Sequence, residues 1–273
     1  MTAKPRTEPP ASDALRADKR KAAELRPIRI SLDYIDFADG AALVECGRTR
    51  VLAAATIEDR VPPFLKGTGR GWITAEYAML PRATLERTPR ERTAGRVSGR
   101  TQEIQRLVGR ALRAVTDLRA LGERQIIIDC DVIQADGGTR SASVTAGCVA
   151  LGLALKKMMD LGLLGQMPLR HLVAGVSVGV VRGRTLLDLD YSEDCQADLD
   201  MNVIETDRGE LVEVQAGAEK CPFSRQDLLG LLKMADKGIG RIIQLQKRAL
   251  KEKSFLFMAY GYKEKTGPDR GPG

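Results

Sequence analysis

Alternating apolar and polar residues, together with short apolar runs, mark the segments of this chain that we expect to form β-strands. In segment 125–134, for example, Ile128 and Cys130 alternate with Asp129 and Asp131. Successive side chains of a strand point to opposite faces, so one face of such a segment can be buried. The pattern predicts strands at 28–34, within 41–57, and at 125–134, 172–181, 185–191, 201–206 and 210–215, with glycine-containing turns at 38–40, 182–184 and 207–209.

Apolar residues fall at helical spacing in three further segments. The first is 99–121, where Gly122 provides a stop, and the second begins at Ser141. The third follows Ser224 and Asp227, which have the spacing of a capping box. The apolar stripes consist of Ile104, Leu107, Val108, Ala111, Val115 and Leu118 in the first helix, Val144, Cys148, Leu151 and Leu155 in the second, and Leu228, Leu232, Ala235, Ile239 and Ile242 in the third.

These elements form two β-rich halves, each followed by helices, which indicates an internal structural duplication without a visible sequence repeat. We therefore predict an α+β fold and a single domain over residues 15–262. Segments 1–14 and 263–273 are polar and contain proline or glycine, and we expect them to be disordered tails.

The composition favours a polyanionic partner. Hydrophobic residues make up 43% of the 273 residues, enough for a sizeable core, and 43 Lys and Arg against 36 Asp and Glu give a net charge of +7. Nucleic acid is the expected partner ahead of a membrane surface. We expect no membrane span, since no apolar run approaches the ~20 residues required, and no targeting segment.

The cysteines and the single histidine indicate a cellular compartment and exclude several catalytic mechanisms. Most cysteines lie in apolar runs without CxxC spacing, so we expect buried free thiols in a reducing compartment, the cytoplasm. The sole histidine, His171, is expected to be structural, which removes Ser-His-Asp, Cys-His and multi-histidine metal chemistry. Acid–base chemistry must then come from carboxylates, or the site must act by positioning and charge. The cysteines are Cys46, Cys130, Cys148, Cys195 and Cys221.

Segment 135–140, with the sequence Ala-Asp-Gly-Gly-Thr-Arg, joins a predicted strand to a predicted helix. Glycine backbone allows an anion to approach closely, and the free N–H groups of a helix N-terminus point at it. Arg140 adds a planar charged fork suited to phosphate. Neither the nucleotide-triphosphate loop nor the dinucleotide-binding glycine motif is present. We interpret the segment either as a phosphate pocket or as a tight connection alone.

Six acidic residues gather between positions 188 and 200. Such clustering brings mutual repulsion unless a cation offsets it. Mg²⁺ takes carboxylate oxygens and retains waters and substrate phosphates, so two aspartates suffice to hold it. We expect Asp188 and Glu193 at a solvated hairpin edge, and we predict Asp194 and Asp200, beside a predicted strand, as the functional pair.

A cluster of positive charge is formed by six arginines between positions 82 and 100, up to the start of the first predicted helix. Only Glu86 and Glu91 lie among them. A flexible arginine-rich loop suits phosphate backbones and gives salt-dependent, sequence-independent affinity, while protein binding or solubility is the alternative. The cluster consists of Arg82, Arg87, Arg90, Arg92, Arg96 and Arg100.

Longer motifs show that the chain resembles the ribonuclease PH family from about residue 16 to 250. The resemblance is carried by Leu25-Arg26-Pro27, VECG at 44–47, FLKG at 64–67, GWITAEYAMLPRAT at 71–84, GRTQEIQRLVGRALRA at 99–114, CDVIQADGGTRSAS at 130–143, Glu193-Asp194, DMNV at 200–203 and VEVQ at 212–215.

The resemblance implies a phosphate-dependent 3′-to-5′ exoribonuclease that trims the 3′ ends of tRNA precursors. Inorganic phosphate, the co-substrate, would attack the terminal phosphodiester and release a nucleoside 5′-diphosphate. Asp194 would help to hold Mg²⁺, and Asp200 would hold Mg²⁺ or protonate the departing 3′ oxygen. The implied phosphate-binding residues are Arg100, Gly138, Thr139 and Arg140.

The resemblance also implies a homohexameric ring, a trimer of dimers, in which the loop arginines contact tRNA: Arg82, Arg87, Arg90, Arg92 and Arg96. The family fold has two βαβα-type halves, of the kind found in a small-subunit ribosomal protein domain, with mixed sheets packed against helices. This matches the duplication inferred above from the order of elements.

One segment departs from the family pattern. Where the family commonly has QGTAEG, positions 215–220 read QAGAEK, which we expect to change the turn after the strand. The alternative function is a catalytically silent, ring-forming RNA-binding scaffold of the exosome type. The joint presence of Arg100, Arg140, Asp194 and Asp200 argues against it, because a scaffold has no need of all four.

Overall fold

The structure, a computed structural model, describes residues 16–95, 97–220 and 222–252. The predicted tails at 1–14 and 263–273 lie outside the described residues. So do residues 253–262 of the predicted domain and, in the arginine loop, Arg96.

Five strands form the first sheet, in the order β1-β2-β3-β5-β4. All neighbouring pairs are antiparallel except β4 and β5, which are parallel. A parallel pair needs a crossover connection, which helix α1 supplies together with the short α2. The elements are β1 (Ile28–Leu32), β2 (Gly40–Cys46), β3 (Thr49–Glu58), β4 (Trp72–Met79), α1 (Gly99–Ala114), α2 (Leu118–Leu121) and β5 (Gln125–Gln134), with 3₁₀ turns at Pro63–Leu65 and Glu91–Ala94.

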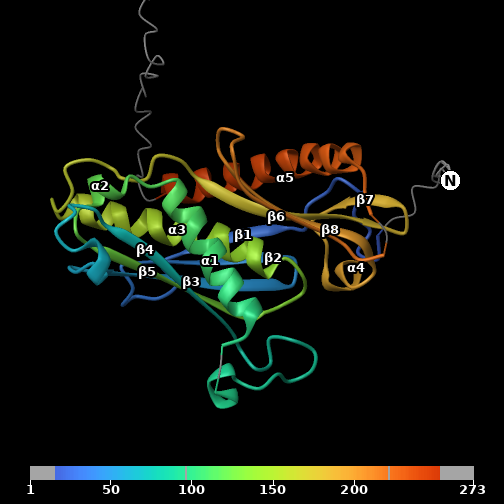
Figure 1. The fold of residues 1–273 in the computed structure, drawn as a ribbon, viewed down its shortest axis with the longest axis horizontal. Coiled ribbons are helices and arrows are strands. Elements are labelled where there is room, and N and C mark those ends of the chain that lie inside the picture. The colour runs from blue at the N-terminus through green and yellow to red at the C-terminus, as the bar shows by residue number, and fades with distance from the viewer. Residues whose placement is uncertain (1–15, 96, 221, 253–273) are drawn as a thin grey trace, which may run out of the picture.

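Four antiparallel strands form the second sheet, in the order β7-β6-β8-β9. Helix α4, between β7 and β8, is a single turn. The long helix α5 packs over this sheet, where Figure 1 shows it running above β6. The elements are β6 (Val173–Val181), β7 (Arg184–Leu187), α4 (Tyr191–Asp194), β8 (Ala197–Thr206), β9 (Leu211–Ala218) and α5 (Arg225–Glu252).

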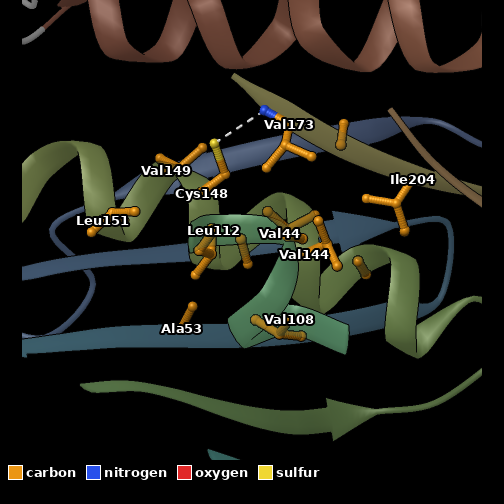
Figure 2. Close-up of a cluster of buried hydrophobic side chains, with 14 of the residues drawn as sticks. Val44, Ala53, Val108, Leu112, Val144, Cys148, Val149, Leu151, Val173 and Ile204 are labelled. Carbon is orange, nitrogen blue, oxygen red and sulfur yellow. Dashed lines mark hydrogen bonds between the residues drawn. The ribbon is translucent and has the colours of Figure 1, made fainter. Parts of the chain in front are cut away.

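Helix α3 (Thr139–Asp160) lies between the two sheets and contacts strands of both. In Figure 2, Val144 and Cys148 of α3 belong to one apolar cluster with Val44 of the first sheet and Val173 of the second, and the Cys148 Sγ accepts a 3.4 Å hydrogen bond from the Val173 N–H. Within the described residues, α3 is the one helix long and apolar enough to span a membrane, yet 83% of its most apolar window is buried inside the protein. A helix surrounded by protein is apolar on all sides, so α3 is the core helix of the fold.

The α+β prediction is confirmed, with one mixed sheet and one antiparallel sheet packed against helices. Segment 41–57 holds two strands, which turn at Gly47 with φ 55°. The helix predicted over 99–121 ends at Ala114 and resumes as α2, because Asp117 caps a new start by accepting from the Arg119 and Ala120 N–H groups.

Several strand predictions were wrong at their ends: the strand predicted at 28–34 ends at Leu32, and the strand predicted at 201–206 begins at Ala197. The strand predicted at 185–191 ends at Leu187, because Asp188 takes a left-handed conformation (φ 55°) and α4 begins at Tyr191. The strand predicted at 210–215 continues to Ala218. Residues 216–218, expected to alter a turn, are therefore part of β9.

Candidate active site

The glycine turn after β5 has the backbone geometry of an anion site. Gly137 and Gly138 have φ of 78° and 67°, in the left-handed region that favours glycine. Gly138 is the N-cap of α3 and offers no side-chain cap, so no side chain there occupies the first N–H groups of the helix. Because α3 begins at Thr139 and not at Ser141, Thr139 and Arg140 belong to its first turn.

Arg140 is held by a carboxylate of the neighbouring helix. Its Nη2 lies 3.2 Å from Glu103 Oε2 on α1, while its buried Nε has no hydrogen-bond partner among the described residues. The adjacent Thr139 Oγ1 accepts a 3.0 Å hydrogen bond from the Tyr77 hydroxyl. The Arg140 guanidinium thus has a fixed position and an unused donor, as a phosphate ligand would require.

Arg100 belongs to the first turn of α1. The N-cap of α1 is Ser98, whose side chain accepts from the Thr101 N–H. The charges of Arg100 and Arg140 both lower the pKa of Asp194, so the two arginines act on the same carboxylate. The two arginines predicted to bind phosphate, Arg100 and Arg140, therefore lie at the same site, near Asp194.

Asp194 and Asp200 form the acidic side of the site. Asp194 is the last residue of α4, whose start is fixed by a reciprocal capping box between Asp190 and Glu193. Burial and the negative charge of Asp200 raise the pKa of Asp194 above its ordinary value, against the lowering effect of the arginines. The two carboxylates are thus close enough to repel each other.

These groups line one cavity of about 550 Å³. All six residues predicted to bind phosphate or to act in catalysis face it, and so do six that the sequence did not single out as site residues. Its lining consists of Arg100, Gly138, Thr139, Arg140, Ser177, Asp194, Cys195, Ala197, Asp200, Asn202, Glu219 and Lys220.

Among the unpredicted residues, Asn202 and Lys220 could have been found from the sequence, whereas Ser177 could not. Asn202 lies two positions after Asp200 on β8, so both side chains lie on one face of the strand. Ser177 pairs with Asn202 across β6 and β8, which only the sheet register reveals. Lys220 comes from the segment that departs from the family pattern, and its Nζ lies 2.7 Å from Asp198 Oδ1.

The expectation that Asp188 and Glu193 lie at a solvated edge was wrong. Asp188 is 4% exposed and Glu193 is 8% exposed, and both form ion pairs with buried arginines. Arg26 and Arg20 bind Asp188, and Arg16 and Arg20 bind Glu193. Burial alone would raise the pKa of Asp188, but the hydrogen-bonded Arg26 guanidinium holds it below its ordinary value.

The described loop arginines, Arg82, Arg87 and Arg90, do not line the cavity. Arg82, Arg87 and Arg90 are exposed on the segment between β4 and α1, which projects from the body at the bottom of Figure 1. The Arg82 Nη1 donates to the Leu85 carbonyl at 2.9 Å. The side chain of Arg92, like all of Arg96, lies outside the described part of the chain.

The expectation of buried free thiols holds for three of the four described cysteines, and His171 lies outside the cavity. His171 Nδ1 lies 3.0 Å from Asp207 Oδ1, and His171 does not line the cavity. Cys46, Cys130 and Cys148 are buried free thiols, whereas Cys195 is exposed, because the end of α4 opens onto the cavity. Cys221 lies outside the described residues.

A cavity that joins an anion-binding turn, two arginines and a carboxylate pair is typical of enzymes that transfer phosphoryl or nucleotidyl groups. Sequence models of the 3′ exoribonuclease family match this chain, domain 1 over residues 24–156 and domain 2 over residues 171–238. The chain is 54% identical over 231 residues to ribonuclease PH of Neisseria meningitidis serogroup C, covering 85% of this chain and 96% of the relative. It is also 54% identical over 236 residues to ribonuclease PH of Moorella thermoacetica, covering 86% of this chain and 94% of the relative.

Solved structures share the fold at lower identity. Rice Rrp46 superposes with a TM-score of 0.70 at 21% identity, covering 86% of this chain and all of that one. A chain of the Archaeoglobus fulgidus exosome with RNA bound to the active site superposes with a TM-score of 0.71 at 23% identity, covering 89% of this chain and 93% of that one. This chain therefore belongs to the 3′ exoribonuclease family. It is a phosphorolytic 3′-to-5′ exoribonuclease.

Proposed function

We propose that this enzyme trims the 3′ ends of tRNA precursors and other RNAs, using the cavity at the start of α3 to bring inorganic phosphate to the RNA end. The observation that carries the proposal is the shared cavity, in which Arg140 and Arg100 face Asp194 and Asp200. Two anions, phosphate and a phosphodiester, must meet there. The arginines offset their repulsion, and the carboxylates suit a cation that binds the RNA phosphate.

In the proposed reaction, a phosphate oxygen held by Arg100, Arg140 and the first N–H groups of α3 attacks the terminal phosphorus. A new P–O bond forms, and the bond from phosphorus to the 3′ oxygen of the preceding nucleotide breaks. That 3′ oxygen takes up a proton, which we assign to Asp200 or to water. The products are a nucleoside 5′-diphosphate and an RNA one nucleotide shorter, and the same steps reversed extend the RNA.

The carboxylate pair fits Mg²⁺. Asp194 and Asp200 repel each other in the protein alone, as the raised pKa of Asp194 indicates, and a divalent cation would offset that repulsion. The described residues contain no cluster of three or more metal-binding side chains. Two carboxylates are nonetheless sufficient for Mg²⁺, which completes its shell with waters and substrate phosphates. When bound, Mg²⁺ would supply charge stabilisation for the transferring phosphoryl group.

The arginine loop is the proposed docking surface for tRNA. Exposed Arg82, Arg87 and Arg90, carried on a segment that projects from the body, can reach a backbone phosphate away from the cavity. We further propose a homohexameric ring, supported by family membership and by the fold shared with chains of exosome assemblies. The buried thiols of Cys46, Cys130 and Cys148 support a reducing, cytoplasmic location.

The test of the substrate proposal is a competition between two RNAs. A 3′-extended tRNA and an unstructured RNA with the same 3′ tail are mixed with enzyme, phosphate and Mg²⁺ at low salt, and their rates of shortening are compared. We expect tRNA to be favoured about tenfold or more through added phosphate contacts. Equal shortening of both RNAs would refute tRNA docking and leave phosphorolysis itself intact.

A further inference from the structure

Arg26 connects the glycine turn to Asp188. Its Nη1 donates to the Asp136 carbonyl at 2.6 Å and its Nη2 to the Gly137 carbonyl at 3.4 Å. On the other side, Nε and Nη2 form a two-point ion pair with the Asp188 carboxylate at 3.0 and 2.6 Å. The side chains of Arg26 and Asp188 are 4% and 5% exposed, so water does not compete for these bonds.

Thr49 holds the same turn from the first sheet. Its hydroxyl donates to the Gly137 carbonyl at 2.7 Å and accepts from the Asp136 N–H at 2.9 Å. The residue is fully buried at the start of β3. A hydroxyl that both donates and accepts holds the Asp136 N–H and the Gly137 carbonyl, just before the N-cap of α3.

Asp188 links this arrangement to the acidic side of the cavity. The Asp188 N–H donates to the Ser177 carbonyl at 2.7 Å, and the Leu189 N–H donates to the Ser177 hydroxyl at 3.0 Å. Ser177 lines the cavity, and α4 follows directly, with Asp194 at its end. The left-handed backbone of Asp188, costly for a non-glycine residue, is stabilised by these contacts.

The turn also sits directly against the chain that leads into α4. A Cβ added at Gly137 would lie 2.6 Å from the Leu189 carbonyl oxygen and 2.7 Å from the Asp190 carbonyl carbon. A Cβ added at Gly138 would lie 3.0 Å from Arg26 Nη2. A shift of either segment would therefore displace the other.

We propose that Arg26, Thr49 and Asp188 are positioning residues that set the phosphate-binding turn relative to the helix carrying Asp194. None of the three lines the cavity, so they act through Gly138, Thr139 and Arg140 and not on substrate. The inference rests on the proposed function, in which the turn binds the attacking phosphate. It predicts that the three residues govern the KM for phosphate without governing RNA binding.

Thr49→Val tests the proposal with the least disturbance, since it removes the hydroxyl and keeps the shape. We expect the KM for phosphate to rise about fivefold, the worth of one hydrogen bond, with the KM for RNA unchanged. Thr49→Ser keeps the hydroxyl and should restore the KM for phosphate, although it loses a buried methyl group. Arg26→Lys, which lacks the planar fork, should raise the same KM further.

Thr116→Val is the matched control, because it also removes a buried hydroxyl, which donates to the Leu112 carbonyl at 2.8 Å away from the cavity. It should lower the melting temperature and leave the KM for phosphate as in wild type. If Thr49→Val and Thr116→Val lower the melting temperature and neither changes the KM for phosphate, Thr49 is merely structural and the proposal is wrong. A wild-type enzyme that releases nucleotides without phosphate would instead overturn the proposed function, and the same assay shows which of the two has failed.

Discussion

Asp200 and Gly217 face each other across β8 and β9, and a Cβ at position 217 would lie 3.2 Å from the Asp200 Oδ1. Gly217 belongs to the segment that departs from the family pattern, and residues 215–218 of that segment are strand and not turn. A glycine here leaves space for the Asp200 carboxylate at the cavity wall. The departure therefore bears directly on a proposed catalytic residue.

Gly217→Ala should lower kcat several-fold, because the added methyl group must displace the Asp200 carboxylate by a few tenths of an ångström. The melting temperature should change little, since β9 is an edge strand. Steady-state phosphorolysis of a short oligonucleotide gives the measurement. Gly230→Ala is the control, because nothing lies within 4 Å of a Cβ at that position. An unchanged kcat in Gly217→Ala would show that the Asp200 carboxylate can move without loss.

Replacing Arg140 should weaken the binding of phosphate and leave the binding of RNA unchanged. Arg140→Ala removes a charged hydrogen-bonding group, so the KM for phosphate should rise about tenfold to hundredfold, with tRNA affinity nearly unchanged. Titration of phosphate at saturating RNA, alongside a filter-binding assay for tRNA, separates the two effects. Arg170→Ala, which removes an arginine paired with Asp117 outside the cavity, is the control. Equal loss of tRNA binding in Arg140→Ala would remove Arg140 from the phosphate role.

The arginine loop should contribute to the binding of tRNA and not to the turnover of short oligonucleotides. Arg87→Ala with Arg90→Ala should weaken tRNA binding and reduce the salt slope of log affinity by about 2, since each arginine accounts for about one phosphate contact. Turnover of short oligonucleotides should survive. Arg241→Ala with Arg248→Ala, on the exposed side of α5 and away from the loop, is the charge-matched control. Loss of activity on both substrates would contradict a docking role.

The stability of the protein should fall as pH rises through neutrality because of Glu205. Burial and the neighbouring Asp236 raise the pKa of Glu205 from 4.5 to about 7. Since folding favours the protonated form, its contribution is fully present below the unfolded pKa of 4.5 and is lost as pH rises through about 7.

Glu205→Gln mimics the protonated form at every pH. It should therefore raise the melting temperature by about 3 °C at high pH and by about 1 °C or less at low pH. Thermal unfolding at about pH 5.5 and about pH 8.5 measures this difference. Asp236→Asn, which removes the neighbouring charge, should flatten the dependence of the wild type. A melting temperature of Glu205→Gln that is offset equally at both pH values would contradict the assignment.

The sequence predicted those strands and helices whose apolar pattern lies within the element itself. Strand β5 has the predicted bounds, because its alternation reports one buried face, and the apolar stripe of α1 packs as expected. The end of β7 and the single turn of α4 could not be predicted. The chain leaves the strand at Asp188 because Arg26, 162 residues away in the sequence, binds its carboxylate.

The site was predictable to a similar degree. Arg140 and the glycine turn follow from local chemistry, while Arg100 and the roles of Asp194 and Asp200 depended on the resemblance to a family. Ser177 was missed because only the register of β6 with β8 brings it to the cavity. The burial of Asp188 was missed because its arginine partners come from the N-terminal segment.

The central claim is that inorganic phosphate is the attacking group, and labelled phosphate tests it directly. Enzyme, Mg²⁺ and a 3′-extended tRNA are incubated with phosphate that carries a radioactive phosphorus, and the released mononucleotides are separated. We predict nucleoside 5′-diphosphates that carry the label in the β-phosphate, with no release when phosphate is left out. Unlabelled nucleoside 5′-monophosphates, released at the same rate with or without phosphate, would mean hydrolysis and would contradict the account.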